Sequence, residues 1–221
     1  MGIINFPPVE LADKNGLLAI GGDLEPSSLL LAYSKGIFPW PISEQAPLAW
    51  FSPDPRGVIF YDDLRVSTSL KKLLRKNPFE VKINNDFEEI IHQCAKVKRP
   101  GQTGTWITKE IINAYIALHR AGHAYCIGSY QDGQLVGGIY GVNIGRFVSG
   151  ESMFFTQSNA SKIALISLME YLKSRQVEWL DTQMITPVVQ DLGGKEIPRK
   201  QFLELLNSSL YTAYEQKIFT N

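Results

Sequence analysis

The stretch from Arg146 to Met184 constrains the fold more than any other part of the chain. Residues 146–155 (RFVSGESMFF) are mostly apolar and β-favouring, which predicts a buried strand. Asn159 can then cap a helix with apolar positions at helical spacing, and residues 177–185 (VEWLDTQMI) predict a second strand. A strand, helix, strand unit of this length forms a right-handed crossover, so we expect both strands to lie parallel in one sheet.

Three polar residues interrupt these two strands. Glu151 lies near the end of the first, and Asp181 and Gln183 are two apart in the second, where a side-chain period of two places them on one face. In open sheets, ligands bind beyond the carboxyl ends of parallel strands, so these three side chains should converge on a site. The alternative is that each is an edge-strand residue facing water.

The bulk composition limits the possible classes of protein. With 221 residues and 44% apolar content, the chain can bury a core. Its 22 basic and 22 acidic residues cancel, so a nucleic-acid partner would have to use a local basic patch, such as residues 67–76 or 96–99. No apolar run is long enough to span a bilayer, no signal peptide is evident, and Cys94 and Cys126 lack metal-type spacing. We therefore expect a cytoplasmic protein with reduced thiols and no membrane or metal partner.

Prolines and strand signals predict two unequal parts. Residues 1–60 hold most of the prolines around one short helix, which predicts a small N-terminal domain. Residues 61–221 predict helices and then a meander of three antiparallel strands with turns at Asp132-Gly133 and at 143–145. With the crossover unit added, this order is typical of the α+β acyl-CoA N-acyltransferase-like (acetyltransferase) fold. In that mixed β-sheet, the last meander strand and the strand after the helix are parallel and splay apart.

Two tryptophans stand where they can either fill a core or line a cleft. Trp40 lies between two prolines in GIFPWP, which hold the chain extended. Trp106 precedes a helix that Thr108 caps and Gly122 ends. An aromatic wall in a cleft stacks with a nucleobase or a hydrophobic side chain, and the sequence leaves both interpretations open.

Several longer motifs carry a resemblance to a known family. They are LLAIGGDLEPSSLLLAYSKGIFPW (17–40), FSPDPRGV (51–58), GTWIT (104–108), GESMFF (150–155) with NASK (159–162), DTQ (181–183) and LGGKEIPR (192–199). In this order, and over nearly the whole chain, they resemble the leucyl/phenylalanyl-tRNA-protein transferases. The resemblance implies an enzyme of the bacterial N-end rule. Such an enzyme moves Leu or Phe, with Met left open, from aminoacyl-tRNA to the α-amino group of a protein that begins with Lys or Arg.

The resemblance also implies roles for the polar residues. The donor ester is already activated, so no ATP, cofactor or metal is required, and the enzyme mainly holds two substrates in reacting geometry. Gln183 matches the residue whose side-chain oxygen accepts a hydrogen bond from the attacking amine, and Asp181 matches the residue that orients and polarises it. Glu151 matches the residue that contacts the terminal Lys or Arg of the acceptor.

A third set of residues matches positions that bind or surround the donor aminoacyl-tRNA. They are Tyr33, Trp40, Trp106, Tyr115, Met153 and Phe154, of which the last two fit apolar walls that select Leu and Phe side chains. One position departs from the family, because many members have asparagine where this chain has Thr186. A hydrogen bond made there by an amide must come from a hydroxyl or a water.

Two other functions fit parts of the sequence. An acetyl-CoA-dependent N-acetyltransferase would share the fold, but it usually needs a Gly-rich loop at the helix after the meander. Residues 157–162 (QSNASK) contain no glycine, which argues against it. The other alternative is a non-catalytic module that binds tRNA or peptide ends. It predicts that Asp181 and Gln183 can be changed without loss of function.

Overall fold

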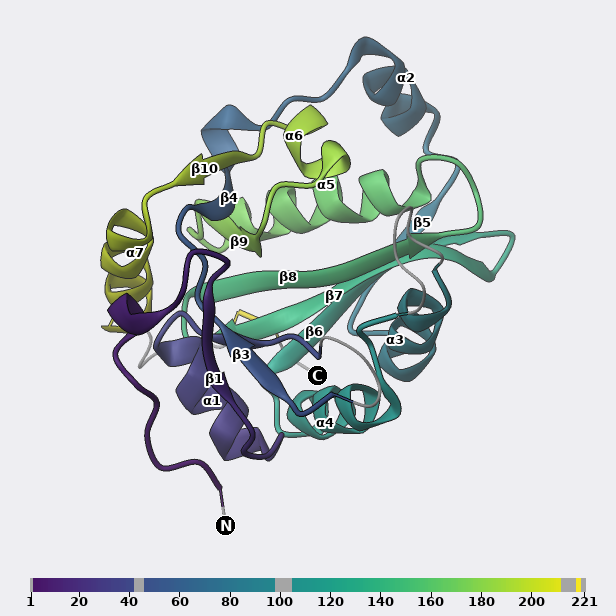
Figure 1. Ribbon diagram of the computed structural model, residues 1–221. Coiled ribbons are helices and arrows are strands. Elements are labelled where there is room, and N and C mark those ends of the chain that lie inside the picture. Colours follow the sequence, from purple (N-terminus) through teal and green to yellow (C-terminus); the bar gives the residue numbers. More distant parts are fainter. Residues whose placement is uncertain (1, 42–45, 98–104, 212–217, 220–221) are drawn as a thin grey trace.

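The fold is built on a mixed seven-stranded sheet, seen in a computed structural model that describes residues 2–41, 46–97, 105–211 and 218–219 (Figure 1). The strand order is β10-β4-β9-β8-β7-β6-β5. In that order the strands span Lys195–Ile197, Arg56–Phe60, Trp179–Gln183, Phe147–Phe155, Gln134–Ile144, Ala124–Gln131 and Glu80–Ile83. β8 and β9 run parallel, and the other neighbouring pairs are antiparallel. The predicted α+β class with a mixed sheet is confirmed.

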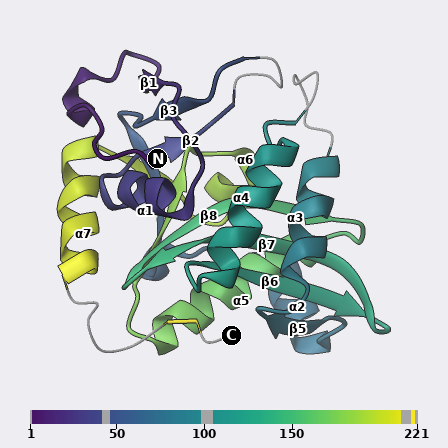
Figure 2. The same cartoon turned by 90° about the horizontal axis from the view of Figure 1, so that it is seen from below.

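Helices cover both faces of this sheet, as the two views in Figure 1 and Figure 2 show. On one face lies α5, Ala160–Ser174, whose apolar side chains share a core with residues of α2, Thr68–Lys76, and α6, Pro187–Asp191. The opposite face carries four helices: α1, Pro26–Ser34, α3, Phe87–Lys96, α4, Lys109–Arg120, and α7, Arg199–Tyr211. Two hydrophobic cores therefore enclose the sheet.

The N-terminal segment adds a small sheet on the α1 side. Its strands lie in the order β1-β3-β2 and span Leu17–Ile20, Ala49–Phe51 and Phe38–Pro39. Tyr33 and Trp50 from this segment share one core with Tyr115 of α4, so the segment is packed firmly on the larger part. The predicted boundary at residue 60 stays a prediction, and β4, which precedes it, is a strand of the seven-stranded sheet.

Local sequence signals explain most element boundaries. The Thr108 side chain accepts a 3.4 Å hydrogen bond from the Ile111 N–H at the start of α4. Asp132 and Gly133 have φ of 51° and 75° at the β6–β7 turn, as this dipeptide predicts. The expected cap of α5 is wrong in one detail. Asn159 occupies the N-cap position in a left-handed conformation, and its side chain makes no capping hydrogen bond.

The strand that carries Asp181 is central and shorter than predicted. β9 lies between β4 and β8, so the alternative of an edge strand facing water is wrong. It ends at Gln183 and not at residue 185, because Gln183 has a left-handed φ of 59° and cannot continue an extended strand. The short strands β4, β5 and β10 were not predicted, since runs of three to five residues carry little periodicity.

The predicted basic patches are only partly described. Lys71, Lys72, Arg75 and Lys76 of α2 are exposed, which is consistent with a solvated helix face. Lys98 and Arg99 of the second patch lie outside the described residues, as does Gly104 of the GTWIT motif.

We predict that Gly141→Ala destabilises the sheet. A methyl group on Gly141 in β7 would overlap the carbonyl oxygen of Ser149 in β8 and meet the Tyr125 hydroxyl at 2.7 Å. That hydroxyl donates to the same carbonyl, so neither neighbour can move freely. We expect the free energy of unfolding in urea to fall by about 1–3 kcal/mol, the usual effect of overpacking.

Gly150→Ala is the matched control on the facing strand. Its added methyl would meet the nearest atom, Cδ1 of Ile139, at 3.4 Å, an ordinary contact. We expect its free energy of unfolding to be unchanged or slightly raised. Equal losses in the two variants would contradict the close approach of β7 and β8 at Gly141.

Candidate active site

Two irregularities separate β8 from β9 and open the centre of the sheet. The two parallel strands share a single bridge, Ser149 with Asp181. Just beyond it, β8 carries Glu151 as an extra residue, because Gly150 and Ser152 oppose the consecutive Gly141 and Tyr140. In β9 Thr182 is the extra residue relative to β4. The predicted splaying of these strands is therefore produced by a bulge in each.

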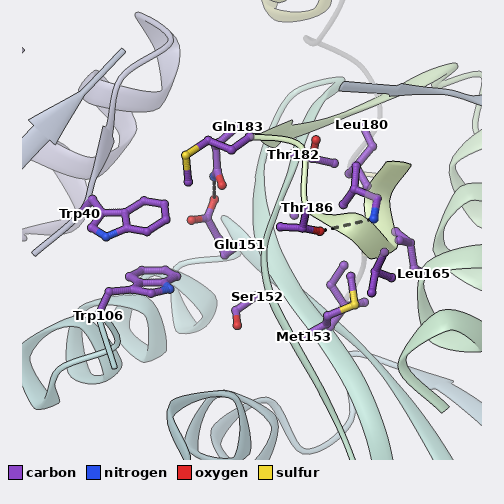
Figure 3. A pocket seen from close by; sticks show the side chains of 15 residues that line it. Trp40, Trp106, Glu151, Ser152, Met153, Leu165, Leu180, Thr182, Gln183 and Thr186 are labelled. Carbon is purple, nitrogen blue, oxygen red and sulfur yellow. Dashed lines mark hydrogen bonds between the residues drawn. The ribbon is translucent and has the colours of Figure 1, made fainter. Parts of the chain in front are cut away.

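A pocket of about 300 Å³ occupies the opening (Figure 3). At one end the rings of Trp40 and Trp106 stack with centroids 5.5 Å apart. Glu151 and Gln183 lie in the middle, joined by a hydrogen bond. Apolar side chains form most of the other end: Ile139, Met153, Leu165, Leu180, Val188 and Val189. The pocket thus combines an aromatic end, a polar middle and an apolar end.

Glu151 is the centre of the polar network. Its Oε1 accepts hydrogen bonds from the Ser149 hydroxyl at 2.8 Å and the Gln183 amide nitrogen at 2.7 Å. Its Oε2 is 3.5 Å from the Tyr115 hydroxyl, which shares a 2.5 Å hydrogen bond with the Tyr33 hydroxyl. Because the Gln183 nitrogen is directed at Glu151, the amide oxygen of Gln183 remains able to accept a proton donor.

The environment of Glu151 changes its ionisation. Burial raises the pKa of Glu151 to about 7, and the charge of Asp181 adds to this, whereas hydrogen bonds from Ser149 and Gln183 act in the opposite direction. Burial and the charge of Glu151 raise the pKa values of Tyr33 and Tyr115 well above the usual range. Both phenols therefore stay neutral and can donate hydrogen bonds.

Asp181 lies behind the pocket and is paired with a residue that the sequence analysis missed. Arg56 Nη2 is 2.7 Å from Asp181 Oδ2, and Arg56 Nε is 2.9 Å from Asp181 Oδ1. Both side chains are almost fully buried. Asp181 meets Gln183 through the backbone, because its Oδ1 accepts from the Gln183 N–H at 2.9 Å. A signal for Arg56 existed, since a carboxylate that stays charged in an apolar strand is usually paired with a cation.

The structure brings together only some of the predicted donor-binding residues. Trp40, Trp106 and Met153 line the pocket. Tyr33, Tyr115 and Phe154 are buried and do not line the pocket. In these positions their side chains do not reach a donor bound in the pocket. Phe154 packs in the core with α3 and α4 because side chains alternate along β8, and it faces away from Met153.

The predicted division of the β9 side chains is also corrected. A side-chain period of two would place Leu180, Thr182 and Met184 on the face opposite to Gln183, yet all four line the pocket, whereas Asp181, expected on the same face as Gln183, does not. The left-handed φ of Gln183 and the bulge at Thr182 break the alternation there. Thr186, where many family members have asparagine, caps α6 by accepting a 3.3 Å hydrogen bond from the Val189 N–H.

No group of three or more His, Cys, Asp or Glu side chains within the described ranges is arranged to hold a metal ion. Of the helices that the structure describes, none has the length and apolar character needed to cross a bilayer.

Two family models match this chain. The description leucyl/phenylalanyl-tRNA protein transferase N-terminal domain applies to residues 22–54. The description leucyl/phenylalanyl-tRNA protein transferase applies to residues 58–207, which is more than half of the chain. This chain belongs to the leucyl/phenylalanyl-tRNA–protein transferase family. The resemblance seen in the sequence motifs is thereby confirmed.

Individual members of the family are similar over nearly their whole length. The leucyl/phenylalanyl-tRNA–protein transferase of Flavobacterium johnsoniae is 49% identical, with 92% of this chain and 95% of that protein covered. The protein of the same name in Syntrophobacter fumaroxidans is 46% identical, with coverage of 93% and 87%. Among solved structures, L-PGS from Bacillus licheniformis is 9% identical with a TM-score of 0.40, covering 72% of this chain and 50% of that one. A likeness at that level carries no functional argument.

We predict that Glu151 titrates near neutral pH. In protein labelled with ¹³C at glutamate carboxyl groups, one resonance should have a midpoint at about 7. Ser149→Ala removes a hydrogen bond that lowers this pKa, so the midpoint should move higher. Glu151→Gln should delete the resonance and so assign it. A Glu151 midpoint near the reference value of about 4.3 would contradict the buried environment.

Proposed function

We propose that this protein transfers leucine or phenylalanine from an aminoacyl-tRNA to the α-amino group of a protein that begins with Lys or Arg. The amine attacks the ester carbonyl, an amide bond forms, the ester C–O bond breaks, and the ribose oxygen leaves as a hydroxyl. One proton passes from the amine to that oxygen or to solvent. The observation that carries the proposal is the pocket in which Glu151 and Gln183 lie between an aromatic end and an apolar end.

The two ends of the pocket suit the two parts of the donor. The apolar end, with Met153 and Leu165, offers a flexible thioether and a branched side chain, which can accommodate either leucine or phenylalanine. At the opposite end, the stacked rings of Trp40 and Trp106 offer an aromatic surface for the terminal adenine of the tRNA. The ester bond between these groups would then lie beside the polar middle.

The polar middle suits the acceptor. An incoming Lys or Arg side chain supplies the cation that stabilises the Glu151 carboxylate in its partly buried position. The α-amine has a reference pKa of about 8, so only a modest shift toward its neutral form is needed. The Gln183 amide oxygen accepts a hydrogen bond from this amine. An amide is too weak a base to keep the proton, so Gln183 positions the amine and passes the proton on.

The product of this reaction begins with a large apolar residue and is, in bacteria, an N-end rule degradation signal. We place the reaction in the cytoplasm, where both substrates occur. The free, buried thiols of Cys94 and Cys126 are consistent with a reducing compartment.

The test is transfer of labelled leucine from Leu-tRNA to a peptide that begins with Arg, without ATP or acetyl-CoA. We expect wild type to transfer to this peptide and not to one beginning with Ala. Gln183→Ala should lower kcat by about 100-fold through loss of positioning. Transfer of an acetyl group in a parallel reaction supplied with acetyl-CoA, with no transfer from Leu-tRNA, would support an acetyltransferase instead. Binding of tRNA or peptide without transfer, in a folded wild type with charged tRNA verified, would support a binding module.

Glu151→Gln tests the acceptor contact. We expect kcat/KM for the Arg peptide to fall by about 10–100-fold, because a hydrogen bond to a charged group is lost. In wild type, kcat/KM for this peptide should also fall as the pH drops below about 7, since the Glu151 carboxylate becomes protonated there. The variant should lose the part of this dependence that comes from Glu151 and keep only the part that comes from protonation of the α-amine. An unchanged pH profile in the variant would contradict the assigned role.

Trp106→Ala tests the aromatic end. We expect KM for Leu-tRNA to rise by roughly 5–100-fold, the effect of losing about 1–3 kcal/mol of base stacking, with little change in KM for the peptide. Trp50→Phe is the matched control. Trp50 is buried in the N-terminal core against Phe6 and lies outside the pocket lining, so it should alter stability but not KM for tRNA. Equal effects of the two variants would refute an adenine site at the tryptophan pair.

A further inference from the structure

Arg56 is the most completely bound cation in the described part of the chain. Its Nε and Nη2 hold both oxygens of Asp181, and its Nη1 donates to the Gly36 carbonyl at 3.0 Å. Its guanidinium carbon lies 4.3 Å from the ring centroid of Phe202 and 4.9 Å from that of Phe38. Arg56 therefore joins the segment after α1, strand β2, helix α7 and strand β9 at one point.

We propose that Arg56 is a positioning residue for the transfer reaction, acting through Asp181 on Gln183. The inference rests on the proposed function. Arg56 has no place in the pocket lining and touches neither substrate in the arrangement described above. Its effect on the reaction is to fix the direction of the Gln183 side chain.

The chain of contacts has three steps. Arg56 fixes both oxygens of Asp181 with a two-pronged hydrogen bond, which sets the plane of the carboxylate. The Oδ1 of that carboxylate also accepts from the backbone N–H of Gln183. This bond holds Gln183 at φ 59°, a conformation uncommon outside glycine, and the side chain then meets Glu151 at 2.7 Å.

The contacts of Arg56 with Asp181 also determine how strongly the charge of Asp181 acts on its surroundings. A buried carboxylate that is fully engaged by a guanidinium has its charge compensated locally. Asp181 therefore orients the backbone of Gln183, and the guanidinium of Arg56 reduces the part of its negative charge that acts on the Gln183 amide or on an ammonium group. Glu151, which contacts the Gln183 side chain directly and has no cationic partner among the described residues, is the carboxylate available to the substrate.

The fork geometry of arginine is required for this role. A lysine at this position would keep one positive charge, but an ammonium group cannot hold both Asp181 oxygens and the Gly36 carbonyl in one plane. Arg56→Lys therefore separates the two possible roles of the pair. It preserves the charge near Asp181 and removes the geometric restraint.

The experiment compares Arg56→Lys, Arg56→Gln, Asp181→Asn and the double variant R56Q/D181N in the Leu-tRNA assay. We expect each single variant to lower kcat at least about 10-fold with KM for the Arg peptide changed less than about threefold, as for a lost orientation. In the double variant, the side-chain amides at positions 56 and 181 can hydrogen-bond to each other, and no charge is buried there. The amide oxygen at position 181 can still accept a hydrogen bond from the Gln183 N–H. Its kcat should exceed that of Asp181→Asn.

The opposite pattern would overturn the inference. If Asp181 acts through its charge, Arg56→Lys keeps wild-type kcat, and the double variant is no better than Asp181→Asn. Arg120→Met is the matched control, because it removes an exposed 2.7 Å ion pair with Glu88, and we expect wild-type kcat and KM.

A second measurement does not depend on the reaction. In ¹⁵N NMR spectra the side-chain amide resonance of Gln183 should shift or broaden in Arg56→Lys and remain in place in Arg120→Met. An unmoved resonance in folded Arg56→Lys would refute the positioning role even if the other variants do not fold. A wild type that transfers nothing would refute the proposed function, while this resonance would still report whether Arg56 positions Gln183.

Discussion

Two carboxylates lie close together inside the central sheet, and a buried carboxylate requires compensation for the water it loses. Asp181 is compensated by a full ion pair with Arg56. Glu151 is compensated only by neutral hydrogen-bond donors, which do not offset its burial, so its pKa is raised. The first carboxylate therefore belongs to the framework of the protein, and the second remains responsive to what enters the pocket.

The different roles of the two carboxylates depend on where the pairing of β8 with β9 is interrupted. A regular parallel pair would bring β8 and β9 together along their whole length and leave no space between them. The bulges at Glu151 and Thr182 end the pairing after one bridge. The same residues that open the pocket are thus among those that line it, so the shape of the cavity and its polarity arise from one local feature.

Sequence reasoning predicted the parts of this arrangement that are local. The meander, the crossover helix and the convergence of Glu151 with Gln183 follow from periodicity and from the geometry of parallel strands. The pairing of β4 with β9 did not follow, because it joins residues about 120 positions apart and leaves no periodic trace. Arg56 was missed for the same reason. The burial of Tyr33 and Tyr115 outside the pocket was also not predicted, since both lie on helices and a motif gives the identity of a residue but not what its helix packs against.

The contact of Phe202 with the guanidinium of Arg56 has a consequence for synthesis of the chain. A protein folds from its N-terminus as it leaves the ribosome, and this contact joins residue 56 to a helix that begins more than 140 residues later, at Arg199. The surroundings of the strand that bears Gln183 are completed only when α7 has emerged. The support of Gln183 is therefore completed after the strands that form the pocket have been made, so the nascent chain and the finished protein differ at this residue.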